Sequence, residues 1–285
     1  MVSVSSGASA VFGIGMIKDK DSFRNIGLIG RPDRASVVDT LNLLEQYLLQ
    51  EGLTVIYDEG TAALMQREGL QVCSRPLLGE VCDLVIVVGG DGSLLHAARA
   101  LARYKTPVLG VNRGRLGFLT DISPDEVITK VAAVLHGDYT VDYRFLLNLE
   151  VRSNGNPVGE ALALNDVVLH AGKSVHMLEF ELYIEGQFVY RQRSDGLIVA
   201  TPTGSTAYAL SGGGPIMHPR LDAIVLVPMH PHTLSSRPIV VDGDSEIKIR
   251  ISETTLRPLV SPDGQTGLSL STGDWVYITK HPFKL

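Results

Sequence analysis

Leu84-Val85-Ile86-Val87-Val88 leads directly into Gly89-Gly90-Asp91-Gly92, and this junction decides the fold of the first half of the chain. A continuous aliphatic run of this length indicates a strand covered on both faces, as in a parallel sheet with helices on each side. The preceding sequence has a similar run at residues 26–29, followed by apolar residues at helical spacing, which are Val37, Leu41, Leu44 and Leu48. This pattern predicts a strand followed by a helix.

The same alternation continues on both sides of the junction. A further apolar run occupies residues 53–57, a helical pattern with Leu94, Ala98 and Leu101 follows the glycines, and a last run occupies residues 107–111. We therefore expect an α/β N-terminal domain built on a doubly wound parallel sheet.

After about residue 140 the apolar period changes from a helical spacing to two. Leu147, Leu149 and Val151 alternate with polar residues, and residues 180–184 and 247–251 repeat the alternation. Glu185-Gly186 is a turn sequence between two such runs. The pattern predicts a mainly antiparallel β C-terminal domain. The expected organisation is a tail or tag-like extension at 1–22, the α/β domain at 23–125 and the β-rich domain at 126–285.

The composition and charge of the chain indicate which classes of binding partner are not expected. The 285 residues are 45% hydrophobic and 20% charged, with a net charge of −6 and no basic stripe, so nucleic acid is not an expected partner. No apolar run is long enough to span a bilayer, and we expect no membrane partner. The two cysteines, Cys73 and Cys82, are too few for a disulfide framework, which suits a reducing, cytoplasmic compartment.

The three glycines around Asp91 allow positive φ angles and let backbone N–H groups approach an anion, which favours phosphate. The loop is neither a dinucleotide fingerprint, because Leu95 stands where that motif needs glycine, nor a Walker A sequence. The alternative is a simple strand-to-helix turn in which Asp91 caps the helix at Ser93.

A second cluster, Thr201–Gly214, gathers hydroxyls and glycines with Tyr208 directly after the apolar run 196–200. Such a loop can hydrogen-bond sugar and base edges. The alternative, a flexible surface linker, is disfavoured by the enclosed Tyr208 and Leu210.

Five motifs in order make the chain resemble the bacterial NAD kinase (ATP/polyphosphate-NAD kinase) family over roughly residues 24–285. They are Gly89-Gly90-Asp91-Gly92, the stretch 112–118 (NRGRLGF), Asn165-Asp166, the stretch 195–208 with DGLI and TPTGSTAY, and Asp263-Gly264-Gln265. The related lipid kinases and phosphofructokinases share the first motif without the fourth.

The resemblance implies transfer of the terminal phosphoryl group of ATP, or of polyphosphate, to the adenosine-ribose 2′-hydroxyl of NAD, giving NADP. It also implies Mg²⁺ or another divalent cation bound with the nucleotide, and a homo-oligomer, either tetramer or dimer. Family members have a further C-terminal segment, and the resemblance implies that this segment is missing from the chain.

The family's residues carry over by position. Asp91 corresponds to the aspartate that accepts the hydroxyl proton. The residues implied in binding substrate or cofactor are Gly90, Asp91, Gly92, Phe118, Asn165, Asp166, His176, Arg193, Asp195, Thr203, Thr206, Ala207, Tyr208, Ala209, Leu210, Ser211, Asp263 and Gln265. Asp166 departs from the usual Glu and is one methylene shorter. We expect no fixed metal, and His230-Pro231-His232 is interpreted as a turn.

Two other functions stay open at this point. One is a lipid or sugar kinase that shares the loop around Asp91. The other is an NAD(P)-binding sensor without turnover, against which the carboxylate of Asp91 argues, because binding alone needs no base there.

Overall fold

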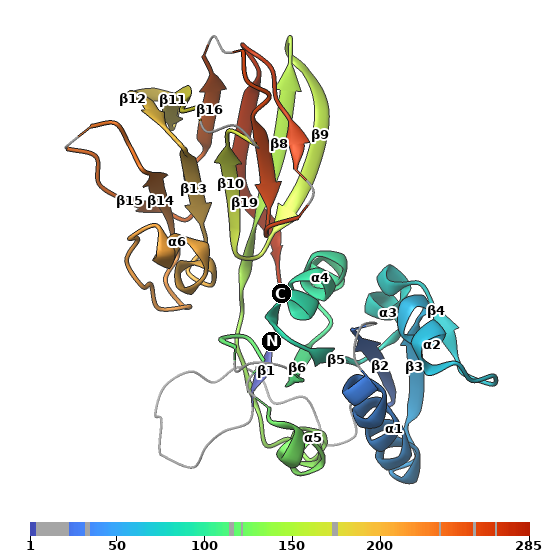
Figure 1. The fold of residues 1–285 in the computed structure, drawn as a ribbon. Coiled ribbons are helices and arrows are strands. Elements are labelled where there is room, and N and C mark those ends of the chain that lie inside the picture. The colour runs from blue at the N-terminus through green and yellow to red at the C-terminus, as the bar shows by residue number, and fades with distance from the viewer. Residues whose placement is uncertain are drawn as a thin grey trace. The chain divides into compact units, whose positions relative to one another are not determined.

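The chain forms two compact units in the computed structural model, which describes residues 1–3, 23–31, 35–113, 117–120, 122–172, 176–233, 235–252, 255–265 and 267–285. One unit comprises Met1–Tyr143 with Phe283–Leu285, and the other comprises Arg144–Pro282. Figure 1 shows both units and labels most of their helices and strands.

The first unit is built on a five-stranded parallel sheet with the order β4-β3-β2-β5-β6. The strands of this sheet are β2 (Asn25–Gly30), β3 (Thr54–Asp58), β4 (Val72–Cys73), β5 (Leu84–Gly89) and β6 (Val108–Asn112). Its helices are α1 (Ala35–Gln50), α2 (Glu59–Met65), α3 (Arg75–Val81), α4 (Asp91–Leu101) and α5 (Val127–Leu135), with short 3-10 turns η1 (Ala102–Tyr104) and η2 (Pro124–Glu126).

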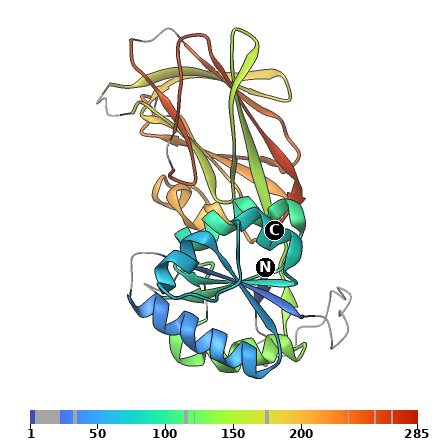
Figure 2. The ribbon, with the colours of Figure 1, turned by 90° about the vertical axis from the view of Figure 1, so that its right-hand side faces the viewer.

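Helices cover both faces of this sheet, as Figure 2 shows with α1 and α5 together on one side. Leu41, Leu44 and Leu48 of α1 are fully buried in one core with β2, β5 and α5. On the other face, the backbone of Gly27 in β2 lies against Leu78 of α3. The predicted doubly wound α/β architecture is confirmed, because the apolar run at 84–88 is buried on both faces.

The strand order reverses between β2 and β5. The chain leaves β2 towards β3 and leaves β5 towards β6, so the two connections diverge at the carboxyl ends of neighbouring strands. Open α/β sheets bind ligands at such a switch point. Gly89 ends β5 at this edge, which places the glycine turn where a ligand is expected.

The first unit extends beyond the boundary expected at residue 125. Helix α5 packs its buried Val127, Val131 and Val134 into the same core as α1, so its apolar face assigns it to the α/β unit. Met1–Ser3, expected to be tail, includes β1 (Val2–Ser3), which pairs with β7 (Thr140–Val141). The rest of the expected tail, residues 4–22, lies outside the described residues.

The second unit is a sandwich of two six-stranded antiparallel sheets. One has the order β15-β14-β13-β10-β17-β18 and the other β12-β11-β16-β19-β8-β9. The strands are β8 (Phe145–Ser153), β9 (Asn156–Ala163), β10 (Asp166–His170), β11 (Leu178–Ile184), β12 (Gln187–Ser194), β13 (Gly196–Ala200), β14 (Ala223–Met229), β15 (Ile239–Asp242), β16 (Ile247–Ile251), β17 (Leu259–Pro262), β18 (Leu268–Ser269) and β19 (Trp275–Lys284).

The alternation read from the sequence places side chains as predicted. Leu147, Leu149 and Phe180 are fully buried in the core between the two sheets. Glu185 and Gly186 both have positive φ and form the tight turn that joins β11 to β12. The outer face of the sheet containing β10 and β13 is covered as well, by a segment with η3 (Gly204–Thr206) and α6 (Tyr208–Ser211). Strand β13 is therefore buried along its whole length.

The described residues include no helix that is both long and apolar enough to cross a membrane. Cys82 is buried and Cys73 is partly buried, and both are free thiols. Burial raises the pKa of Cys82 to about 12, so this thiol stays protonated and packs as a small apolar side chain.

Candidate functional site

The carboxylate of Asp91 holds the loop that follows β6. Its Oδ2 accepts the N–H of Phe118 at 2.9 Å. Its Oδ1 accepts the N–H groups of Leu119 and Thr120, each at 3.2 Å, and the Thr120 hydroxyl at 3.1 Å. Four donors therefore fix the position of the carboxylate, and Oδ2, with one hydrogen bond, keeps free acceptor capacity.

Asp91 does not cap its own helix. Gly90 is the N-cap residue of α4, and the Ser93 N–H donates to the Gly90 carbonyl at 2.9 Å. The alternative in which Asp91 serves as a helix cap is therefore wrong. The loop approaches so closely that a Cβ at Gly117 would overlap the Asp91 carboxylate, which explains glycine at that position.

The glycines next to Asp91 have different physical roles. None of Gly89, Gly90 and Gly92 has a positive φ, so the left-handed backbone that glycine permits is not used at these three positions. A Cβ at Gly89 would overlap the Ser93 side chain, so close packing requires that glycine. A Cβ at Gly90 or Gly92 would meet no atom within 4 Å. The space above those two is open, as the close approach of a ligand requires.

In the β unit, Asp263 organises the segment that carries the predicted pair Asn165 and Asp166. Its Oδ1 accepts the N–H of Asn165 at 2.8 Å and that of Asp166 at 3.2 Å, and its Oδ2 accepts the N–H of Leu164 at 3.0 Å. Asp263 and Gly264 both have positive φ, and the Gln265 N–H donates to the Pro262 carbonyl at 2.9 Å. This is a type I′ turn, for which Asp-Gly is a preferred sequence.

Asp166 is almost completely buried, with 4% of its surface exposed, at the start of β10. Among the described residues, none donates a hydrogen bond to its carboxylate, so it does not act as a turn cap. Burial raises the pKa of Asp166 to about 7, and the charge of Asp263 adds to the rise. An uncompensated buried carboxyl that faces a cavity is typical of a ligand-binding position.

The raised pKa of Asp166 predicts how the free energy of unfolding depends on pH. The Asp166 carboxyl has a pKa of 3.8 in the unfolded chain and about 7 in the folded protein, so the folded state binds its proton more tightly. The folded state therefore has its full stability below pH 3.8 and loses stability as the pH rises to 7. Between pH 5 and pH 8 we expect the ligand-free wild type to lose roughly 1–3 kcal/mol of unfolding free energy relative to Asp166→Asn. Urea unfolding of both proteins at the two pH values measures this difference. An equal pH dependence in both would contradict the assignment.

Residues 201–205 anchor the second glycine-rich segment in the β unit. All five are buried, the Thr201 hydroxyl donates to the Leu164 carbonyl at 2.6 Å, and the Ser205 hydroxyl donates to the Pro202 carbonyl at 2.6 Å. A Cβ at Gly204 would overlap the Asn165 carbonyl, so glycine permits this close approach. The segment is part of the packed fold and is not a linker.

The outer face of the β10 sheet contains a cavity of about 990 Å³. Its lining includes seven of the predicted binding residues, namely Asn165, Asp166, Asp195, Ala207, Tyr208, Asp263 and Gln265. Asn165 Oδ1 is buried and has no hydrogen-bond partner among the described residues. An orphaned acceptor that lines a cavity requires a donor from outside the protein chain, which a water molecule or a ligand can supply.

Other predicted residues of the β unit lie outside the cavity lining. Thr203 is buried and accepts a hydrogen bond from Arg144 Nη1, and Ala209 is fully buried in the core under α6. The exposed ones are His176, Arg193, Leu210 and Ser211, and Thr206 is half-buried. In the α/β unit, Phe118 is 72% exposed and is therefore not a core residue.

Two charged residues at the end of β12 have different surroundings. Asp195 Oδ2 pairs with His230 Nδ1 at 2.9 Å, and the side chain of Arg193 extends from an exposed position on β12. His230 has a positive φ, as expected of a turn. Among the described residues, no group of three or more His, Cys, Asp or Glu side chains could hold a metal ion.

Sequence reasoning missed His170 and Ser261, which line the same cavity. The Gly172 N–H donates to His170 Nδ1 at 3.2 Å, so the ring proton is on Nε2, which donates to the Ser261 hydroxyl oxygen at 3.2 Å. Burial lowers the pKa of His170, which keeps the ring neutral. The signal was available, because Asp166, Val168 and His170 alternate on one face of β10.

Doubly wound sheets bind nucleotides at the carboxyl ends of their strands, where Asp91 lies, and the β unit has a separate cavity of about 990 Å³. The fold and these two sites are typical of a nucleotide-binding enzyme. The family model described as ATP-NAD kinase N-terminal domain matches residues 26–139, and that of the ATP-NAD kinase C-terminal domain matches residues 164–285. The chain belongs to the NAD kinase family and phosphorylates NAD to NADP.

Individual relatives agree with this assignment. The chain is 67% identical to the NAD kinase of Acinetobacter baylyi over 264 residues, covering 93% of this chain and 86% of the relative. It is 65% identical to the NAD kinase of Azotobacter vinelandii over 266 residues, covering 93% and 90%. These relatives exclude the lipid or sugar kinase and the sensor without turnover.

Two solved structures share the fold. The crystal structure of yeast NADH kinase complexed with NADH has a TM-score of 0.84 at 28% identity, covering 92% of this chain and 81% of that one. The structure of an Archaeoglobus fulgidus NAD kinase in complex with ATP has a TM-score of 0.71 at 25% identity, covering 91% of both chains.

Proposed function

We propose that Asp91 is the general base of the reaction, and that it takes the proton of the adenosine-ribose 2′-hydroxyl of NAD. The hydroxyl oxygen forms a bond to the terminal phosphorus of the donor, and the bond from that phosphorus to its bridging oxygen breaks. The observation that carries the proposal is the carboxylate held by four donors, with Oδ2 accepting a hydrogen bond only from Phe118. A base fixed in this way keeps its orientation during the transfer.

We propose ATP as the donor, with Mg²⁺ or another divalent cation carried by its phosphates. The open space above Gly90 and Gly92 supports this proposal, since side chains there would occupy the volume that phosphates and their cation need. Magnesium keeps several water ligands and binds mainly through substrate phosphates, so a phosphate-bound cation needs room more than a protein cage. The cation would neutralise charge on the transferred group.

A coupled assay tests the donor and the cation. With NAD as acceptor we expect NADP formation with ATP and Mg²⁺, and a loss of at least tenfold when EDTA removes the divalent cation. Polyphosphate in place of ATP, at equal phosphoanhydride concentration, is the alternative donor. Equal rates with EDTA would contradict the cation, and a higher rate with polyphosphate than with ATP would contradict ATP as the preferred donor.

For the acceptor we propose that the cavity of the β unit binds NAD. Asn165 Oδ1 lacks a donor and Asp166 lacks a partner among the described residues, which suits the hydroxyl and amide hydrogens of a dinucleotide. Tyr208, 47% exposed beside the cavity, offers an aromatic face to a ring. The remaining predicted residues are retained as proposed contacts, namely Phe118, His176, Arg193, Asp195, Thr203, Thr206, Ala207, Leu210, Ser211, Asp263 and Gln265. Ala209 is not retained, because it is fully buried in the core under α6.

We also propose a cytoplasmic homo-oligomer, tetramer or dimer. The two free cysteines support a reducing compartment. The oligomer is supported by the resemblance to the family.

A further inference from the structure

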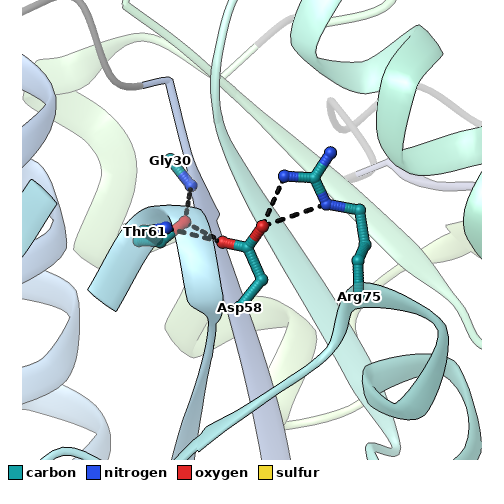
Figure 3. A network of polar contacts seen from close by, with 4 residues as sticks. All are labelled: Gly30, Asp58, Thr61 and Arg75. Atoms are coloured by element: carbon teal, nitrogen blue, oxygen red, sulfur yellow. Dashed lines mark hydrogen bonds and ion pairs between the residues drawn. The ribbon is translucent and has the colours of Figure 1, made fainter. Parts of the chain in front are cut away.

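A buried polar network in the α/β unit shows how this protein normally satisfies a buried hydroxyl (Figure 3). Asp58, 3% exposed, accepts hydrogen bonds from the Arg75 guanidinium on Oδ2 and from the N–H and hydroxyl of Thr61 on Oδ1. The Thr61 hydroxyl oxygen in turn accepts the Gly30 N–H at 2.7 Å. Because this hydroxyl both donates and accepts within the protein, its hydrogen is not available to a ligand.

A comparable hydroxyl in the β unit is left incomplete. Ser261, 8% exposed, lines the cavity of about 990 Å³ together with His170. The Ser261 hydroxyl oxygen accepts the Nε2–H of His170 at 3.2 Å, because the Gly172 N–H already donates to Nδ1. Among the described residues, none accepts the hydrogen of the Ser261 hydroxyl. A buried hydroxyl hydrogen requires an acceptor, which must then come from water or a ligand in the cavity.

Glycine at position 267 keeps the Ser261 hydroxyl accessible. Gly267 lines the same cavity, and a Cβ there would overlap Ser261 Oγ. The neighbours of Ser261 on the same face of the sheet are Val168, opposite on β10, and Leu259, two residues earlier on β17. Both side chains are apolar and offer no acceptor. The hydroxyl hydrogen is therefore available to a molecule in the cavity.

The cavity presents different hydrogen-bonding groups along its length. Asp166 and His170 both line it from β10, and the four residues that separate them correspond to roughly 13 Å at about 3.3 Å per residue. Asn165 Oδ1, next to Asp166, has no donor among the described residues, whereas Ser261 has a hydrogen without an acceptor. The cavity therefore distinguishes the parts of a ligand by their donors and acceptors.

We propose that Ser261 donates its hydroxyl hydrogen to a base of the bound dinucleotide, and that His170 is a positioning residue that orients this hydroxyl. The inference rests on the proposed binding of NAD in the cavity of the β unit. The apolar neighbours Val168 and Leu259 suit a flat ring, and the neutral pair has no charge to attract the pyrophosphate. The acceptor is a ring nitrogen of adenine or the carboxamide oxygen of nicotinamide. Since the His170 Nε2–H occupies one lone pair of Ser261 Oγ, the hydroxyl hydrogen points away from the imidazole.

Calorimetry of NAD binding tests the role of Ser261. We expect Ser261→Ala to raise the Kd for NAD about fivefold, the effect of one neutral hydrogen bond, and to leave the KM for ATP within about twofold. Thr61→Val is the matched control, because it also removes a buried hydroxyl, in this case from the complete network of Figure 3. We expect this control to lower the melting temperature and to leave the Kd for NAD within about twofold.

A double-mutant cycle tests whether His170 acts through Ser261. We expect His170→Leu to weaken NAD binding about threefold, because the Ser261 hydroxyl remains but can rotate, and the double variant to bind as weakly as Ser261→Ala alone. His170→Gln, whose amide can donate to the Ser261 hydroxyl oxygen, should restore binding to within about twofold of wild type. A loss of about fifteenfold in the double variant, the product of the single losses, would overturn the positioning role of His170. An equal loss in His170→Gln and His170→Leu would overturn it as well.

ADP-ribose, which retains adenine and lacks nicotinamide, identifies the base that accepts the hydrogen bond. If Ser261→Ala also weakens ADP-ribose binding about fivefold, the acceptor is adenine, and if it weakens only NAD binding, the acceptor is nicotinamide. An unchanged Kd for NAD in Ser261→Ala, together with weaker binding in Asn165→Ala, would overturn this proposal alone. Unchanged affinity in both variants would also overturn the proposed binding of NAD in the cavity.

Discussion

Turnover of the Asp91→Asn variant is expected to fall by roughly 10²–10⁴-fold, the usual contribution of a positioned general base, while NAD still binds. An amide cannot accept the hydroxyl proton. The amide oxygen can keep the three hydrogen bonds that Oδ1 accepts from Leu119 and Thr120. The loop should therefore stay close to its native position. Measurement of kcat with ATP, together with NAD affinity by calorimetry, separates chemistry from binding.

Thr120→Val is the matched control for this variant. It removes the hydroxyl that donates to Asp91 Oδ1 and keeps the Asp91 carboxylate. Thr120 is fully buried, and valine is similar to threonine in size. We expect kcat to fall by less than about tenfold, because the three backbone N–H donors still orient the base. If Asp91→Asn retained turnover comparable to Thr120→Val, Asp91 would serve to position the loop and another group would be the base.

The second large effect is expected for Asp263→Ala. This change removes the acceptor of the three N–H groups of residues 164–166, which lie about a hundred positions earlier in the chain. Partly buried donors without acceptors should lower the free energy of unfolding by roughly 2–4 kcal/mol. Because these N–H groups position Asn165 and Asp166, we also expect NAD affinity to fall more than tenfold. Thermal unfolding and calorimetry measure the two effects.

Asp274→Ala distinguishes this role from general stabilisation. Asp274 is buried, and its Oδ2 accepts the Ser271 N–H at 2.8 Å in a turn that does not line the cavity. We expect it to lower stability by roughly 1 kcal/mol and leave NAD affinity unchanged. Equal losses of affinity in the two variants would show that Asp263 acts only through stability.

The secondary structure and the fold class were predictable because they depend on local patterns. The run at 84–88 is buried throughout, and the alternation of Leu147, Leu149 and Val151 gives one buried face. The residue at which the α/β unit ends was harder to predict from local patterns. Helix α5 has a clear apolar face at Val127, Val131 and Val134, but nothing local indicates which core that face joins.

The candidate site was only partly predictable from motifs. Asn165, Asp166 and Tyr208 were found by resemblance and line the cavity of the β unit. His170 belongs to no motif, and neither does Ser261. The pairing of β10 with β17 brings these two residues together, although they lie 91 positions apart in sequence. Such residues are identified by the contacts that position them, because the sequence around them contains no recognisable motif.

The sequence by itself determined the two kinds of domain, the glycine turn around Asp91 and the family. Apolar periods and ordered motifs are properties of neighbouring residues. Only the tertiary structure decided what the two central aspartates do. Asp91 holds residues 118–120, at least 27 positions away, and Asp263 holds residues 164–166, at least 97 positions away. The physical reason is that a carboxylate takes whichever N–H groups the folded chain brings within about 3 Å, and sequence spacing does not specify that meeting.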